Sequence, residues 1–216
     1  EEWLPLFPLG VVLLPGQSLP LHIFEERYKR MIGECLQAGR PFGMVCYTGT
    51  EMKEVGCTAR VTEVVQRYPD GRLDILCAGE RRFRIEEQDQ SEAYLRGRVS
   101  YFADGELPAD EEVTRRLRDA ALSGLLFQEE LAALLGSEPT AQSADATDLE
   151  VVSFALAGSE GFTLEEKQAF LEMTSTAERI RRAVGALQKL VERLKLSLEI
   201  RRIIGGNGHP PAVLGS

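Results

Sequence analysis

The chain has 216 residues, of which 44% are hydrophobic and 27% are charged. These proportions are typical of a globular protein and exclude a disordered chain, a collagen-like repeat and a miniprotein that depends on disulfide bonds. No apolar run approaches the roughly 20 residues that a membrane-spanning helix needs, so we expect no membrane span. The length predicts one large domain or two small ones.

The net charge of −9 is distributed unevenly along the chain. Residues 102–172 hold 16 acidic and 4 basic side chains, whereas residues 173–216 hold 3 acidic and 8 basic ones. Binding to a phosphate backbone needs a concentrated basic surface, and the long acidic stretch would repel nucleic acid. We therefore do not expect unassisted nucleic-acid binding.

The four cysteines are Cys35, Cys46, Cys57 and Cys77, and they fit small core residues better than metal ligands. The sequence contains no CxxC pair and only 2 histidines, so it offers few zinc ligands. The last three cysteines lie in apolar runs that are typical of strands. We expect reduced cysteines, a cytoplasmic location, and neither a metal nor a cofactor.

Residues 1–103 have the pattern of a β domain with one early helix. Short apolar runs interrupted by proline and glycine are typical of the edges and corners of a small barrel. Helical spacing predicts a helix from Glu25 to about Ala38, which Gly39 ends. We expect about seven short strands in a mostly antiparallel PUA-like barrel. The strand-like runs lie at residues 4–7, 11–14, 19–24, 42–47, 55–68, 73–77, 82–85 and 94–102.

Residues 104–204 are predicted to form a helical bundle. Asp104-Gly105 with Pro108 marks the boundary between the two domains. Capping-box patterns begin at Thr163 and at Ser175. We expect helices at roughly 110–135, 145–157, 163–172 and 176–204, a linker over 136–147, and a flexible tail over 205–216.

The last helix carries apolar residues at alternating spacings of four and three, which is a heptad seam. The seam consists of Ile180, Val184, Leu187, Val191, Leu194 and Leu198. It can pack on the shorter helices of the same chain, which is the interpretation we favour, or pair with a second copy as a homodimer through residues 176–204. The basic side chains beside it can neutralise the acidic helices before it.

No catalytic pattern is found. The P-loop, nucleophile-elbow, zinc-protease and Rossmann signatures are absent from the sequence. His22 lies at alternating strand spacing and is interpreted as a structural histidine. His209 belongs to a tail rich in glycine and proline, which cannot hold a catalytic base rigidly. The chain is therefore predicted not to be an enzyme.

Six motifs in the first half point to a known family. They are LPLFPLGVVLLPG at residues 4–16, LPLHIFEERYKRMI at 19–32, FGMV at 42–45, VGCTARV at 55–61, DGR at 70–72 and GERRFRI at 79–85. Together they closely resemble the N-terminal, substrate-binding domain of Lon proteases. The resemblance covers about residues 4–102, and the helical remainder fits the family in pattern more than in motif.

The resemblance implies an α+β fold, in which a PUA-like β-barrel precedes a helical bundle. In Lon proteases this region recruits substrates and aids assembly, and ATPase and Ser-Lys peptidase modules follow it. These 216 residues carry the motifs of neither module, so the chain looks like a stand-alone protein of this type. We expect a module that binds unfolded or exposed polypeptide segments, as an adaptor in proteolysis, or a dedicated protein partner.

Four aromatic residues near predicted strand ends are candidates for peptide binding, because aromatic side chains are enriched at interfaces. They are Trp3, Tyr47, Tyr68 and Phe102. Ordinary packing at corners of the fold is the competing interpretation for each of them. A cleft between barrel and bundle is the expected location of a binding site.

Two other functions stay open at the level of sequence. A PUA-like barrel is similar to RNA-binding folds, and five arginines on neighbouring strands could form a basic strip. They are Arg81, Arg82, Arg84, Arg96 and Arg98. An unrecognised hydrolase would need a buried pair of carboxyl groups with strongly separated pKa values.

Overall fold

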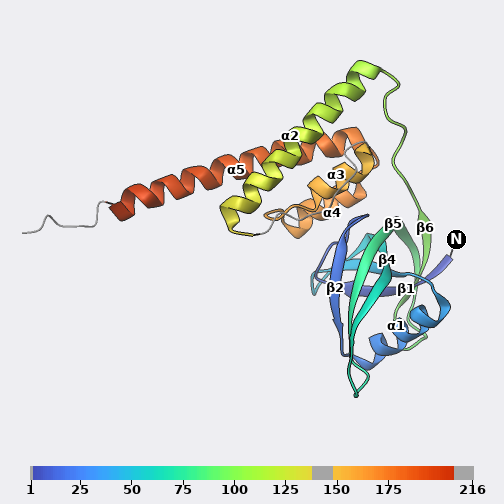
Figure 1. Cartoon of the computed structure of the whole chain (residues 1–216). Coiled ribbons are helices and arrows are strands. Elements are labelled where there is room, and N and C mark those ends of the chain that lie inside the picture. The colour runs from blue at the N-terminus through green and yellow to red at the C-terminus, as the bar shows by residue number, and fades with distance from the viewer. Residues whose placement is uncertain (1, 138–147, 207–216) are drawn as a thin grey trace, which may run out of the picture.

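The computed structural model describes residues 2–137 and 148–206 and consists of a β half followed by a helical half (Figure 1). The β half contains β1 (Glu2–Leu9), β2 (Ser18–Ile23), α1 (Glu26–Ala38), β3 (Phe42–Tyr47), β4 (Met52–Arg67), β5 (Leu73–Asp89) and β6 (Arg96–Tyr101). The helical half contains α2 (Glu111–Leu135), α3 (Leu149–Ala157), α4 (Leu164–Glu172) and α5 (Thr176–Gly206).

The backbone pairings of five strands close into a ring. β1 pairs with β3 and with β6, and the pairs β3–β4, β4–β5 and β5–β6 complete it. β2 pairs with the first part of β5 outside this ring. The α+β class is confirmed, and the strand pairings are mostly antiparallel, as expected, with one exception. The β1–β3 pair is parallel, because β2 and α1 form a crossover between these two strands.

The side chain of Phe83 fills much of the space that the five paired strands enclose. A Cβ atom at Gly43 would lie 2.7 Å from the Phe83 ring, and one at Gly56 would lie 2.6 Å from it. Glycine is therefore needed at both positions to admit the ring, and this small core has few other members. It consists of Leu4, Leu6, Val45, Phe83, Ile85 and Val99.

In the ranges that it describes, the structure has six strands where about seven were expected, and the runs at residues 73–77 and 82–85 are parts of one strand, β5. The apolar run at residues 11–14 is not a strand, although Val12, Leu13 and Leu14 are buried. It lies flat on β5, where a Cβ at Gly79 would come within 2.3 Å of the Leu14 carbonyl oxygen. Apolar sequence alone does not separate a buried irregular segment from a strand.

The predicted early helix is present, and Gly39 ends it with a φ of 60°. Tyr28, Met31, Ile32 and Cys35 form its buried face. They belong to the larger of two hydrophobic clusters, which continues from the β half into the helical half. All four cysteines are unpaired and buried, as expected from the sequence.

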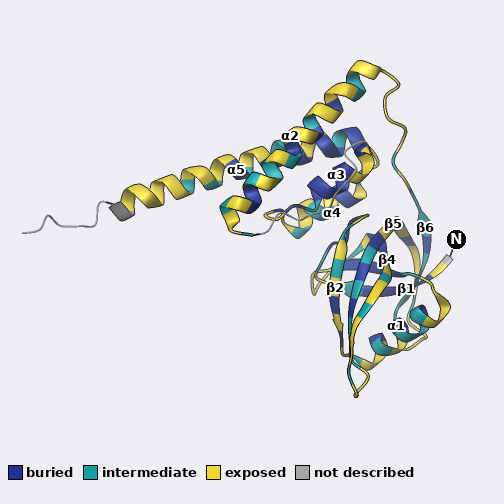
Figure 2. Cartoon of the chain, in the orientation of Figure 1, coloured by how far each residue is buried: buried dark blue, intermediate teal, exposed yellow. Residues whose placement is uncertain are grey.

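The long helix α5 packs its heptad seam within the chain. Ile180, Leu187 and Val191 are buried, and α5 contacts both α2 and α3. Figure 1 shows α5 running on beyond α2, and Figure 2 shows that this distal part is mostly exposed. Leu198, the last seam residue, is 43% exposed. The intrachain interpretation is therefore confirmed for most of the seam but not for its end.

Helix starts agree with the expected caps in most places. Thr163 and Glu166 form a complete capping box at α4, whereas at α5 the Ser175 hydroxyl accepts the Glu178 N–H. The helix expected from residue 145 begins at Leu149, and Asp148 is its N-terminal cap.

The predicted linker beyond residue 137 and the predicted tail beyond residue 206 lie outside the described residues. In the part of the chain that the structure describes, no helix could cross a membrane.

One buried carboxylate joins the two halves. Asp104 Oδ1 lies 2.5 Å from Arg82 Nη2 of β5, and Asp104 Oδ2 lies 2.5 Å from Arg179 Nη2 of α5. All three side chains are almost fully shielded from water. Burial acts to raise the pKa of Asp104, but hydrogen bonds from Arg179 and Thr176 hold that pKa below its usual value.

Further polar contacts cross the same junction. The Arg82 guanidinium donates to the Leu171 carbonyl at 3.1 Å and also to the carbonyl of Met173. The Gln168 amide of α4 donates to the Val55 carbonyl of β4 at 3.0 Å. These bonds fix the orientation of the β half relative to the helical half.

Asp104→Asn tests this junction. The amide leaves two buried guanidinium groups without a counter-charge, so we expect the free energy of unfolding to fall by about 3–5 kcal/mol. Asp119→Asn is the matched control, because Asp119 pairs with Arg115 at 3.5 Å on the surface, and it should cost less than about 1 kcal/mol. An equal loss of unfolding free energy in both variants, measured by urea unfolding, would show that the buried ion pairs of the junction stabilise the protein no more than the surface ion pair does.

Candidate functional site

Three adjoining cavities lie on the β half where the end of β1 meets the start of α1. All three share Pro8, Arg27 and Tyr28 among their lining residues. Their volumes are about 320, 340 and 410 Å³. We call this connected depression the Pro8 groove. Its extent and its mixture of apolar walls and polar rims are those of a site for an extended ligand.

The first arm of the Pro8 groove is the most apolar. It runs between the end of β1 and the segment from β2 to α1, and Phe24 is 60% exposed there. The Phe24 ring stacks on His22 at 5.8 Å between centroids. The arm is lined by Phe7, Pro8, Leu9, Pro20, Leu21, His22, Ile23, Phe24, Glu25, Arg27 and Tyr28.

The second arm passes Tyr47, at the end of β3. The Tyr47 hydroxyl donates to the Gly49 carbonyl at 2.7 Å, which holds the ring at the edge of the groove. The side chain remains 41% exposed. Met52 and Leu95 add apolar surface to this arm, and Thr50, Gln88 and Gln90 add hydrogen-bonding groups.

The third arm ends at Tyr94, whose hydroxyl donates to Glu34 of α1. Burial, followed by this bond, raises the pKa of Tyr94 to about 12. The bond from Tyr94 and a second from Arg30 lower the pKa of Glu34. Tyr94 therefore keeps its proton at neutral pH, and its hydroxyl anchors the segment before β6 to α1.

A polar cluster borders the first arm. His22 Nδ1 lies 2.5 Å from Asp74 Oδ1, and the Tyr68 hydroxyl donates to Asp74 Oδ2 at 2.7 Å. Hydrogen bonds from His22 and then Tyr68 lower the pKa of Asp74. Within residues 2–137 and 148–206, no serine or cysteine is hydrogen-bonded to His22. The arrangement orients the imidazole beside Phe24 and supports the structural interpretation of His22.

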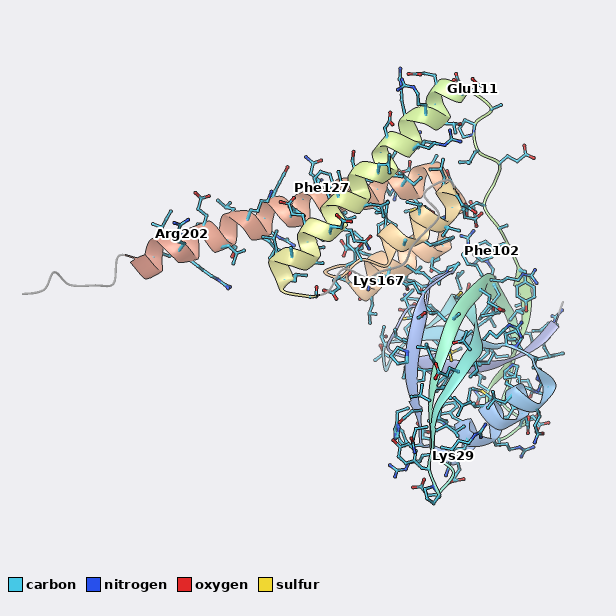
Figure 3. All side chains as sticks on the ribbon, viewed as in Figure 1. Lys29, Phe102, Glu111, Phe127, Lys167 and Arg202 are labelled. Atoms are coloured by element: carbon cyan, nitrogen blue, oxygen red, sulfur yellow. The ribbon has the colours of Figure 1, made fainter. Side chains whose placement is uncertain are left out.

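The four aromatic candidates from the sequence do not form one site. Tyr47 lines the Pro8 groove, and the Tyr68 ring contacts His22 at its border. Trp3 lies on β1 at the β6 edge, with the Arg96 guanidinium 5.8 Å from its ring, and is 42% exposed. Phe102 lies directly after β6, at the exit from the β half (Figure 3), and lines none of the three cavities of the Pro8 groove.

The cleft expected between the two halves exists but is small and charged. It has a volume of about 270 Å³, and Phe102 is one of its walls. The Arg82 guanidinium covers the Phe102 ring at 4.6 Å, so this ring serves the junction. Its lining residues are Pro15, Glu80, Arg81, Arg82, Tyr101, Phe102, Ala103 and Glu150.

The five arginines considered for RNA binding are largely neutralised. Arg82 is buried at Asp104, Arg96 pairs with Asp89 at 2.5 Å, and Arg98 pairs with Glu87 at 3.0 Å. Arg84 lies 3.7 Å from Glu54, and the Arg81 guanidinium covers the Tyr101 ring. These contacts leave little free positive charge for phosphate groups on these strands.

Sequence reasoning missed the residues that all three cavities share, which are Pro8, Arg27 and Tyr28, and it also missed Leu9 and Phe24 of the first arm. Pro8, Leu9 and Phe24 lie in the two N-terminal motifs, and the search for aromatic residues at strand ends passed over them. The available signal was an apolar side chain directly after a proline or at the end of a strand, where the backbone turns.

Among the described residues, no group of three or more acidic, histidine or cysteine side chains could hold a metal ion. The groove is suited to noncovalent binding.

Comparisons with known proteins agree with this picture. The profile of the ATP-dependent protease La (LON) substrate-binding domain matches residues 3–189. A Lon protease of Cytophaga hutchinsonii is 26% identical over 91% of this chain, and one of Paraburkholderia phytofirmans is 26% identical over 93%. The chain spans about a quarter of the length of these relatives, 25% and 26% respectively.

Two solved structures share the fold. A Lon N-terminal domain protein from Xanthomonas campestris has a TM-score of 0.64 at 23% identity and is matched over 86% of this chain and 98% of its own. The N-terminal domain of Mycobacterium avium complex Lon protease has a TM-score of 0.61 at 19% identity, with 87% and 98% covered.

Tyr94→Phe tests the polar contact at the third arm. Removing the hydroxyl removes the largest cause of the lowered pKa of Glu34, so this pKa should rise toward the ordinary value of about 4.3. Carboxyl ¹³C chemical shifts across a pH titration report it directly. Tyr68→Phe, which removes a bond to Asp74 instead, should leave Glu34 unchanged, and an unchanged pKa in the Tyr94→Phe protein would refute the assigned contact.

Proposed function

Because this chain belongs to the family of the ATP-dependent protease La (LON) substrate-binding domain, we propose that it binds exposed apolar segments of other polypeptides in the Pro8 groove. The observation that carries this proposal is the exposure of Phe24 and Tyr47 along connected cavities. Exposed apolar side chains that gather along a cavity, unlike single ones scattered over a surface, are typical of a ligand-binding groove.

Physical chemistry favours an unfolded or extended ligand. Apolar side chains of the ligand gain about 25 cal/mol per Å² of surface removed from water. Around the apolar walls, Arg27, Gln88 and Gln90 offer donors and acceptors for the backbone of an extended segment. A folded ligand hides both its apolar side chains and its backbone groups, so the groove discriminates by conformation more than by sequence.

The wider role follows from this binding. We propose a non-enzymatic adaptor that delivers unfolded or misfolded chains to proteolysis, with a dedicated protein partner as the alternative ligand. The β domain of residues 1–103 supplies the groove, and the bundle of residues 104–204 presents it. Unpaired, buried cysteines favour a reducing cytoplasmic location.

We also propose a homodimer through the helix of residues 176–204, with the contact in the distal part of that helix. Ile180 and Leu187 are already covered by the chain's own helices. A second copy would therefore use the distal part of α5, where Leu196, Ile200 and Ile203 are exposed on the face opposite the seam.

Ile200→Ser with Ile203→Ser tests the dimer. We expect the native chain to sediment as a dimer at micromolar concentration and the double variant to sediment as a monomer, because the apolar contact is lost. Val65→Ser is the control, since Val65 is also exposed but lies on β4. A native chain that sediments as a monomer would refute this contact.

The binding proposal is tested with fluorescence anisotropy of a labelled, permanently unfolded polypeptide. Tyr47→Ser and Phe24→Ser should each weaken binding about tenfold, because each removes a large apolar contact. Trp3→Ser is the matched control, since Trp3 is as exposed as Tyr47 but lies outside the groove. Saturable binding that Trp3→Ser weakens as much as Tyr47→Ser would place the site elsewhere.

A further inference from the structure

The outer face of α5 carries a second groove, and four of its eight lining residues are basic. It has a volume of about 570 Å³ and lies between α5 and the start of α4. We call it the α5 basic groove. Its lining residues are Glu166, Arg181, Arg182, Gly185, Ala186, Lys189, Leu190 and Arg193.

Helical periodicity separates this groove from the buried seam. Arg182, Gly185, Lys189 and Arg193 follow one another at spacings of three and four, so they share one face of α5. The seam residues, including Leu187, lie on the opposite face and are buried against α2 and α3. The basic side chains are therefore not needed for packing within the chain.

The positive charge in the groove is only partly balanced. Arg181 and Arg182 share a single carboxylate, Glu178, at 3.8 and 2.6 Å. Lys189 and Arg193 have no acidic partner within ion-pair distance among residues 2–137 and 148–206. The carboxylate of Glu166 in the groove wall already accepts the Thr163 N–H at 2.7 Å as part of the α4 capping box.

The floor of the groove favours a helix or peptide as the occupant. A Cβ atom at Gly185 would meet nothing within 4 Å, and Ala186 is also small, so another backbone can approach α5 closely. Leu190 adds an apolar contact at the same level. No aromatic side chain of the described residues lines this groove for base stacking, which is the usual companion of a basic groove for single-stranded nucleic acid.

A second copy of α5 is a poor occupant. In a parallel pair, the cations of residues 182–193 would face the same cations of the partner helix. In an antiparallel pair centred on the groove, these cations would again face the cations of the partner helix. In a shifted pair, they would face the apolar distal part of the partner helix. Each arrangement repels charge or buries it without a partner.

We propose that the α5 basic groove docks an acidic, amphipathic segment of a partner protein. Carboxylates of that segment pair with Lys189 and Arg193, and its small or apolar residues lie on Gly185, Ala186 and Leu190. This site is separate from the Pro8 groove. The chain would thus hold a partner protein at α5 while the Pro8 groove remains accessible.

The test is fluorescence anisotropy of the whole chain with a fluorescein-labelled peptide of repeated Glu-Leu-Ala-Glu-Leu-Glu-Glu heptads, which place the leucines on one face of a helix. We expect saturable binding that weakens about tenfold in the double variant Lys189→Glu with Arg193→Glu, because both ion pairs become repulsive. The same peptide with Gln in place of Glu should bind at least about tenfold more weakly. Tyr47→Ser should leave this binding unchanged, which separates it from binding in the Pro8 groove.

The double variant Arg201→Glu with Arg202→Glu is the matched control. It changes the charge of α5 by the same amount. Both residues belong to the last turns of the helix, where Figure 3 labels Arg202, and neither lines the groove. It should bind the peptide as the native chain does. Equal weakening in both double variants would overturn the proposal, because binding would then follow total charge. Absence of saturable binding, or tighter binding of labelled oligothymidine than of the peptide, would overturn it as well.

Discussion

A single buried carboxylate, Asp104, sets the relation between the two halves of this protein. It accepts from one arginine of the β half and one of the helical half. Without this carboxylate, two buried guanidinium groups would have no counter-charge, which is strongly unfavourable. The Phe154 ring, 3.7 Å from the Arg179 guanidinium carbon, covers this network on the α3 side. The large hydrophobic cluster around it spans both halves, so the junction behaves as interior and not as a linker.

This constraint gives the two candidate surfaces a fixed relation. The Pro8 groove is built only from the β half, by segments whose backbones turn at prolines and strand ends. The α5 basic groove is built only from α4 and α5. One surface is apolar with polar rims and the other is basic with a small-residue floor, so they suit different ligands. A rigid junction would allow one chain to engage both of the proposed ligands without either site deforming the other.

Local signals in the sequence predicted most of the elements. Gly39 as a helix end, the capping box at Thr163 and the heptad seam of α5 were readable because each depends on neighbours in the chain. The strand count and the parallel β1–β3 pair were not, because they depend on how Leu14 packs on Gly79 and on where α1 crosses. The groove was found only in part. Tyr47 was among the predicted aromatics, but Pro8 and Phe24 become neighbours through a tertiary contact that no spacing reveals.

Hydrogen–deuterium exchange of the whole chain, with and without a permanently unfolded polypeptide, tests the central claim most directly. If the Pro8 groove binds exposed apolar segments, the amides of residues 21–28 and 47–52 should exchange more slowly in the complex, because these segments form its walls. Residues 7–9 and 88–95, which also line the groove, should respond in the same way, whereas the segment around Asp104 and helix α5 should be unaffected. Slower exchange confined to the junction or to α5, or none anywhere at saturating polypeptide, would contradict the account.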